Sequence, residues 1–190
     1  MDFKNYCLPG KPDRRPATIV EAACATLSSA KVFEAVEFGR PPSKYVAGEL
    51  GANNPIDRVW NEAQRIWKNT DPVGLEPFVS CVVSVGAGRP RSRAIRTDEP
   101  NFAKSILDIA MQTEETAKKF ILTHTALGGK NKRYYRFNVD SLPEFGWDGY
   151  SDSGAIMELA NDYLEGHEQE VEQCAENLQR ESIISSDGKS

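Results

Sequence analysis

Two stretches of this 190-residue chain carry side chains whose types and spacing could support chemistry. The first, residues 44–56, contains Gly48 and Gly51 and then Asn54 and Pro55. It predicts a short strand, a glycine-rich turn and a helix, because Asn54 can cap a first turn and Pro55 suits the first helical position. We expect this unit to present side chains at the carboxyl end of a parallel strand, where α/β proteins place their chemistry.

The second stretch is a basic loop that holds four arginines, namely Arg89, Arg91, Arg93 and Arg96. Charge runs of this kind usually face water, whereas near an anionic lipid surface each basic residue contributes up to about 1 kcal/mol. Both interpretations, a solvated loop and a contact for lipid headgroups, stay open. The preceding Gly86-Ala87-Gly88 lacks the third glycine and the lysine of phosphate-binding loops, so it predicts a tight turn and no nucleotide site.

The sequence contains no residue pattern that is typical of a Ser-His-Asp triad or of a metal site. The two histidines, His124 and His167, stand near predicted helix ends, with no nucleophile at a characteristic spacing. The four cysteines share no metal-ligand spacing, so we expect neither a metal nor another cofactor. They are Cys7, Cys24, Cys81 and Cys174. The last three lie in apolar patterns and are predicted to be buried, reduced thiols, which favours a cytoplasmic location.

Capping signals and periodicity predict the elements before the central stretch. Thr18 and Glu21 form a capping-box pattern that opens a helix to about residue 30. One face of this helix should pack on the fold, and it holds Val20, Ala23, Cys24, Leu27 and Ala30. A strand over residues 32–38 and a turn over residues 39–42 follow.

After the central stretch, helical and strand periodicity alternate. Residues 56–67 predict a helix with one apolar face, made of Ile56, Val59, Trp60, Ala63, Ile66 and Trp67. Residues 78–85 form a nearly continuous apolar run, which predicts a strand covered on both faces, as in a parallel sheet. A long helix over 101–125 and a strand over 133–139 come next. The apolar set over 155–180 fits one kinked helix or two stacked ones equally well.

Composition and charge bound the class of protein. Charged residues make up 27% of the chain and hydrophobic ones 39%, which is ordinary for a globular domain. A net charge of -5 gives no reason to expect nucleic acid as a partner. We also expect neither a membrane-spanning helix nor a signal peptide, because no apolar run is long enough.

The turn Leu50-Gly51-Ala52-Asn53-Asn54-Pro55 resembles the second catalytic motif of the patatin-like phospholipases. In that family an Asp-Gly pair at a strand end often precedes a Leu-Gly-x-Asn-Asn-Pro turn and a helix. Gly48 matches the glycine of this pair, but Ala47 stands where the family has its aspartate. The small-residue helix before the motif, the apolar strand after it and the later strand with Arg136 and Asn138 also fall in the family's order.

The resemblance implies an α/β fold that is part of a three-layer patatin-like domain, with a mostly parallel sheet and flanking helices. It places the C-terminal part of that domain at residues 1–140, a helical extension packed on it at 141–181 and a polar tail at 182–190. It also implies a lipid acyl hydrolase in which a serine attacks an ester, an aspartate is the general base and glycine-rich amides hold the oxyanion.

The residues of this chain depart from that chemistry at three points. They include no Gly-x-Ser-x-Gly elbow, no Asp-Gly-Gly-Gly loop and, at Ala47, no aspartate. Glu49 lies two residues further on and would need a different loop shape to act as the base. The elbow and the oxyanion loop precede the aspartate motif in the family, so the resemblance covers the C-terminal half of such a domain.

Two classes of function are therefore expected. The first is a fragment or pseudoenzyme of a patatin-like lipid acyl hydrolase that is inactive alone. The second is a non-catalytic module that binds lipid or a protein partner and has a regulatory role. The expected partners are a phospholipid membrane surface, the missing N-terminal half or another chain at an open sheet edge. A cytoplasmic protein that is peripheral at membranes fits both classes.

Overall fold

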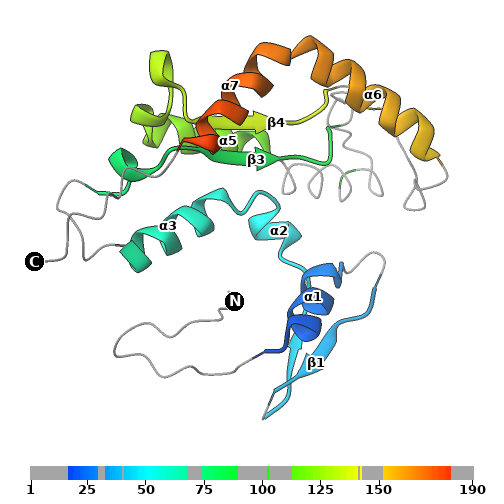
Figure 1. The fold of residues 1–190 in the computed structure, drawn as a ribbon. Coiled ribbons are helices and arrows are strands. Elements are labelled where there is room, and N and C mark those ends of the chain that lie inside the picture. Colours follow the sequence, from blue (N-terminus) through cyan, green and yellow to red (C-terminus); the bar gives the residue numbers. More distant parts are fainter. Residues whose placement is uncertain are drawn as a thin grey trace, which may run out of the picture. The chain divides into compact units, whose positions relative to one another are not determined.

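A computed structural model describes residues 17–29, 33–39, 41–67, 74–89, 102, 113–140, 142 and 152–180 (Figure 1). The chain divides into two compact units, residues 1–53 with 106–111 and residues 54–105 with 112–190. The described elements are helices and short strands, so the α/β class expected from the sequence is confirmed. Within these ranges, none of the helices combines the length and the apolar character that crossing a bilayer requires.

Helix α1 (Ile19–Leu27) opens the described part of the first unit and begins as predicted. The Thr18 hydroxyl accepts a hydrogen bond from the backbone N–H of Glu21, and the Glu21 carboxylate accepts one from the backbone N–H of Thr18. The predicted capping box is therefore confirmed. The predicted packing face is wrong, because Val20, Cys24 and Leu27 are exposed and the buried residue of the helix is Ala25.

A β-hairpin follows α1 in the first unit. Strands β1 (Val36–Phe38) and β2 (Ser43–Tyr45) pair antiparallel, and the rings of Phe38 and Tyr45 stack with centroids 4.2 Å apart. The expectation of a parallel strand before the glycine-rich turn is therefore wrong. Its physical reason is the turn at residues 39–42, where Gly39 has a φ of 92°, because so short a connection can join only antiparallel strands.

The second unit contains the longer helices and a parallel pair of strands. In chain order its described elements are α3 (Ile56–Trp67), η1 (Glu76–Phe78), β3 (Val82–Val85), α5 (Glu114–Thr123), η2 (Thr125–Leu127), η3 (Gly129–Asn131), β4 (Tyr134–Phe137), α6 (Ser153–Gly166) and α7 (Glu168–Gln179). The alternative left open for residues 155–180 is thereby decided, since α6 and α7 are two helices separated at His167. Of the long helix expected over 101–125, the structure describes residues 102 and 113–125, and α5 ends at Thr123, before the predicted end, because Thr125 begins η2.

Strands β3 and β4 lie side by side and parallel (Figure 1), with Val82 opposite Tyr134 and Val85 opposite Phe137. The strand predicted from residue 78 begins later, because Phe78 ends the 3-10 helix η1. Its predicted burial on both faces is also wrong, since Val83 is 39% and Val85 75% exposed. We expected a mostly parallel sheet. Among the described strands only β3 and β4 pair in parallel, because the other two form the antiparallel hairpin.

The core of the second unit lies where α3 and α5 pack together against β4. Its buried residues are Ile56, Trp60, Ala117, Phe120, Leu127 and Tyr134. Trp60 meets the Phe120 ring edge-on at 5.6 Å, and the His124 ring lies 4.6 Å from both. Of the six residues predicted for the apolar face of α3, Ile56 and Trp60 are buried, whereas Val59, Ile66 and Trp67 are exposed. Helix α3 therefore packs into the core of the second unit through its first half.

Candidate functional site

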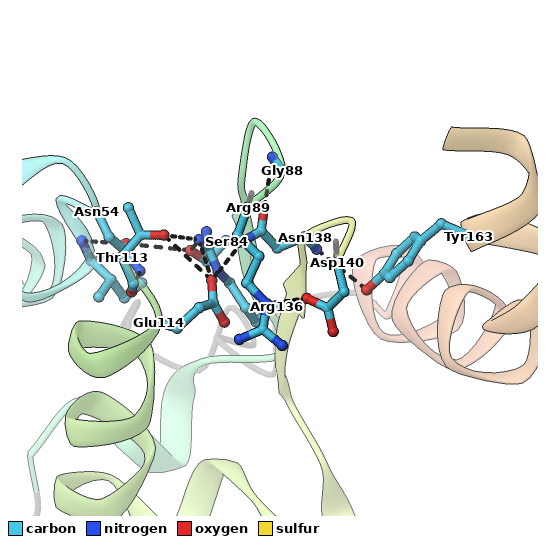
Figure 2. A network of polar contacts seen from close by, with 11 residues as sticks. Asn54, Ser84, Gly88, Arg89, Thr113, Glu114, Arg136, Asn138, Asp140 and Tyr163 are labelled. Atoms are coloured by element: carbon cyan, nitrogen blue, oxygen red, sulfur yellow. Dashed lines mark hydrogen bonds and ion pairs between the residues drawn. The ribbon is translucent and has the colours of Figure 1, made fainter. Parts of the chain in front are cut away.

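Polar side chains gather where the parallel strands β3 and β4 end (Figure 2). Ser84 and Arg136 face each other near the carboxyl ends of these strands, and Asn138 follows β4. Asn54 comes from the start of α3, and Glu114 is the first residue of α5. The carboxyl edge of a parallel sheet is where α/β folds place their sites, so this cluster is the candidate site of the second unit.

Arg136 lies at the centre of the cluster and uses all three guanidinium nitrogens. Its Nε and Nη2 donate to Glu114 Oε1 at 3.0 and 2.8 Å, and Nη2 also donates to Thr113 Oγ1 at 2.8 Å. Its Nη1 donates to Ser84 Oγ at 3.0 Å. The side chain is only 11% exposed, so these partners replace the water that the charge gives up.

Glu114 supplies the negative charge of the cluster. Its Oε1 also accepts a hydrogen bond from Asn138 Nδ2 at 2.7 Å. Burial disfavours the charged carboxylate, but the hydrogen bonds from Arg136 and Asn138 and the charges of Arg136 and Arg89 outweigh it, so the pKa of Glu114 lies below its ordinary value. Glu114 also stands in the first turn of α5, where a negative charge suits the helix dipole.

Asn54 joins the start of α3 to both neighbouring elements. Its Oδ1 accepts hydrogen bonds from the backbone N–H of Ile56 at 3.3 Å and from Ser84 Oγ at 3.4 Å, and its Nδ2 donates to the carbonyl oxygen of Thr113 at 3.2 Å. The side chain is buried. Asn54 therefore caps the first turn, as the sequence predicts, and the same amide links α3 to β3 and α5.

The loop after β3 is fixed by Asn138 and by a second ion pair. Asn138 Oδ1 accepts a hydrogen bond from the backbone N–H of Gly88 at 2.8 Å, and the Arg89 guanidinium is paired with the carboxylate of Asp140. This ion pair raises the pKa of Arg89. A Cβ on Gly86 would lie 2.1 Å from Asn138 Oδ1, so only glycine fits there. The structure therefore gives Gly86-Ala87-Gly88 the role of a close turn beside the cluster.

The first unit holds a separate hydroxyl–carboxylate pair at the family-like turn. Ser29 Oγ lies 2.9 Å from each carboxylate oxygen of Glu49, the residue considered above as a replacement base. The backbone N–H of Ala47 donates to the carbonyl oxygen of Ser28 at 2.9 Å. Gly48 is the residue before α2 (Glu49–Ala52), so the glycine-rich turn forms a short helix.

The two stretches singled out from the sequence are only partly found in the candidate site of the second unit. Within the predicted turn, residues 47–53 belong to the first unit, whereas Asn54 and Pro55 belong to the second. Of the four arginines, Arg89 is paired with Asp140, and the other three lie outside the described residues. Of the predicted site residues with polar side chains that the structure describes, Asn54 and Arg89 belong to the second unit.

Sequence reasoning missed the residues that carry the cluster, namely Ser84, Thr113, Glu114 and, as site residues, Arg136 and Asn138. One signal in the sequence could have pointed to two of them. Arg136 and Asn138 are polar residues at alternate positions of a strand that is otherwise largely aromatic, so they are predicted to share a face. The alternation suggested that this face looks to water. Instead both residues are largely covered, and Tyr134 and Tyr135 are buried as well.

The cluster has a limited chemical repertoire. Ser84 Oγ accepts a hydrogen bond from the Arg136 guanidinium and donates one to the neutral amide oxygen of Asn54, and neither of these two groups can take its proton. The Tyr134 hydroxyl is buried, and this burial raises its pKa, an effect that Ser84 and Arg136 partly oppose. Among the described residues no group of His, Cys, Asp and Glu could hold a metal ion. The contacts among the described residues therefore join α3, β3, α5 and β4.

Comparisons with models of known protein families, with curated proteins and with solved structures found no match to this chain.

Proposed function

We propose that this chain is the C-terminal part of a patatin-like lipid acyl hydrolase domain and that it does not hydrolyse lipid by itself. The observation that carries the proposal is the turn from Gly48 to Pro55, with Ala47 at the position of the family's aspartate. The order of elements supports it, because β2, the turn and α3 follow one another as a strand, a turn and a helix. Asn54 in turn caps that helix with its side chain.

The absence of hydrolysis follows from the residues at the expected positions. Acyl-ester cleavage needs a nucleophile beside a base and donors for the oxyanion. The methyl group of Ala47 cannot accept a proton, and the hydrogen-bond partners of Ser84 in the described part of the chain include no base. Ser29 and Glu49 form the described pair closest to such chemistry, and we assign it the role of joining the end of α1 to α2.

A hydrolysis assay tests the proposal directly. The purified 190-residue chain is given a nitrophenyl butyrate ester and, separately, phosphatidylcholine vesicles, and product is compared with buffer alone. We expect no turnover above that background. A turnover that survives purification and disappears in both Ser29→Ala and Glu49→Ala would contradict the proposal and would make this pair a catalytic dyad.

Complementation tests the family assignment. A tagged N-terminal half of a patatin-like hydrolase, with its serine elbow and oxyanion loop, is co-expressed with this chain or with its Ala47→Asp variant. We expect the two halves to co-purify and ester hydrolysis to arise with Ala47→Asp only. Halves that co-purify without gaining activity on this substitution would count against a patatin-like origin.

A second candidate function is a non-catalytic module that binds a protein or lipid partner. The observation that favours it is the exposed apolar face of β3, where Val83 and Val85 reach the surface. Contiguous exposed apolar side chains on a strand favour contact with another chain. In this function the arginine loop would meet anionic headgroups, and the protein would be cytoplasmic and peripheral at membranes.

A further inference from the structure

Two thiols from distant parts of the sequence meet in the second unit. Cys81 directly precedes β3 and Cys174 lies on α7, and their sulfur atoms are 3.9 Å apart. Both are free thiols; Cys174 is buried and Cys81 is partly exposed. Because a disulfide bond is about 2.05 Å long, the sulfurs need to approach each other by only roughly 2 Å to bond.

A buried polar contact holds α7 in the position that keeps the thiols together. Asn177 Nδ2 donates to the carbonyl oxygen of Lys132 at 2.8 Å and to the Tyr135 hydroxyl at 2.7 Å. That hydroxyl donates in turn to the same carbonyl at 3.0 Å. Asn177 and Tyr135 are both buried. Since Cys174 stands one helical turn before Asn177, this contact keeps its thiol against Cys81.

An ion pair at the start of α7 adds to this anchor. The Lys132 ammonium pairs with the carboxylate of Glu170 and also lies 5.1 Å from the centre of the Tyr135 ring. Helix α7 therefore sits on the residues that precede and begin β4. The sulfur contact is part of this docked arrangement and does not depend on a flexible loop.

We propose that Cys81 and Cys174 are an oxidation-sensitive pair that hydrogen peroxide converts into an intramolecular disulfide, tying α7 covalently to the start of β3. The Cys81 thiolate attacks one peroxide oxygen, so the O–O bond breaks, a sulfenic acid forms and one water leaves. The Cys174 thiolate then attacks the Cys81 sulfur and expels the second water. In total the two thiols give up two protons and two electrons, which the peroxide takes up.

The surroundings of Cys81 set the pace of this reaction. Burial, together with the charge and hydrogen bonding of Cys174, raises the pKa of Cys81 to about 12. Thiolate is the reactive form, so little of it is present at neutral pH, and oxidation should be slow there and speed up as the pH rises. The pair is therefore expected to stay reduced under mild conditions and to respond to strong or lasting oxidation.

Peptide mapping of the full chain tests the pairing. The reduced protein is treated with hydrogen peroxide, blocked with N-ethylmaleimide, digested without reduction and analysed by mass spectrometry. We expect one dominant linked species that joins the peptides of Cys81 and Cys174 and is about 2 Da lighter than the sum of the two reduced peptides, from the two hydrogen atoms removed. Cys24→Ser is the matched control and should leave this species unchanged, whereas Cys174→Ser should abolish it.

Two further measurements keep the proposal falsifiable if a variant fails to fold. Oxidation in concentrated urea should scatter the links among the four cysteines, because the docked arrangement is lost. The oxidised wild type should melt about 5–15 °C above the reduced one, since the bond closes a span of 93 residues. Links of equal abundance in folded and urea-treated protein, or full labelling of Cys81 and Cys174 after peroxide, would overturn the proposal.

Discussion

Ser84 and Arg136 are partners in the β3–β4 ladder, and the Arg136 guanidinium donates a hydrogen bond to the Ser84 hydroxyl at 3.0 Å. The two residues are therefore paired both through the backbone ladder and through their side chains. Through the same guanidinium, Glu114 at the start of α5 is tied to both strands. The stability of the second unit should therefore depend on this one cation more than on any surface charge.

Replacing Arg136 with methionine should lower the free energy of unfolding by about 2–4 kcal/mol, because Glu114 would keep a partly covered charge without its cation. Urea unfolding followed by circular dichroism measures the loss. The matched control is Arg65→Met on α3, which breaks an exposed pair with Glu62 and should cost less than about 0.5 kcal/mol. Equal losses in the two variants would show that the cluster has no special role.

The pH dependence of stability should carry the signature of Glu114. The pKa of this carboxyl is lowered in the folded chain, so its contribution is present above the unfolded value of about 4.3 and is lost as the pH falls through the lower folded value. Unfolding between about pH 3 and pH 7 should therefore show the gap between wild type and Glu114→Gln closing towards low pH. Glu115→Gln, at an exposed neighbour on α5, is the matched control, and a gap between wild type and Glu114→Gln that widens with acid would contradict a lowered pKa for Glu114.

Gly86 should tolerate no side chain. A Cβ there would meet Asn138 Oδ1 at 2.1 Å and Arg136 Nη2 at 2.8 Å, so Gly86→Ala should cost about 1–3 kcal/mol through displaced packing. Gly154→Ala is the control, because nothing lies within 4 Å of its Cβ position in α6 and alanine favours helix. Thermal melting of the two variants should therefore move in opposite directions or move for Gly86→Ala alone.

The exposed face and open edge of β3 should make the chain associate with itself. Among the described strands, β3 pairs only with β4, so its other edge has no partner strand within the described residues, and such an edge can pair with another chain. Sedimentation over a concentration series should show growing complexes, and Val85→Lys should reduce them more than Val59→Lys, an exposed site on α3. A monodisperse monomer with one sharp urea transition would refute the proposal that the chain is half of a larger domain.

The arginine loop should give weak, salt-sensitive binding to anionic vesicles. Arg91→Glu with Arg93→Glu should lower co-sedimentation with phosphatidylserine vesicles, since each basic residue contributes up to about 1 kcal/mol near such a surface. The control pair is Arg58→Glu with Arg65→Glu on α3, which changes the net charge equally. Binding that falls equally in both double variants would reflect net charge and would remove the loop from the proposed function.

Local signals in the sequence were sufficient for the helix starts. The capping box of Thr18 and Glu21 and the cap at Asn54 depend on residues two or three positions apart, and both form as predicted. Strand partners were less accessible, because pairing depends on which segments meet in space. The direction of β2 was nevertheless implied by the short turn before it, and weighing that turn against the glycine-rich motif would have predicted the hairpin.

The candidate site escaped prediction for a different reason. Arg136 takes partners from β3 and from the start of α5, which are 52 and 22 residues away in the chain. No spacing rule links residues at such separations, and an arginine in a strand ordinarily suggests an exposed face. The 3-10 helix η1 likewise depends on a residue far away in the sequence, because Arg133 Nη1 donates hydrogen bonds to the carbonyl oxygens of Glu76 and Val79.

The separation of β3 from β4 also sets an order of events for the nascent chain. Ser84 and Arg136 are 52 residues apart, so at ordinary rates of synthesis β3 is made about 3 to 10 seconds before its partner strand. During that interval the edge of β3 that later pairs with β4 has no partner strand, and loop closure over this distance is itself slow. A chaperone that binds extended apolar segments would therefore find its target in residues 82–85 before β4 has been synthesised.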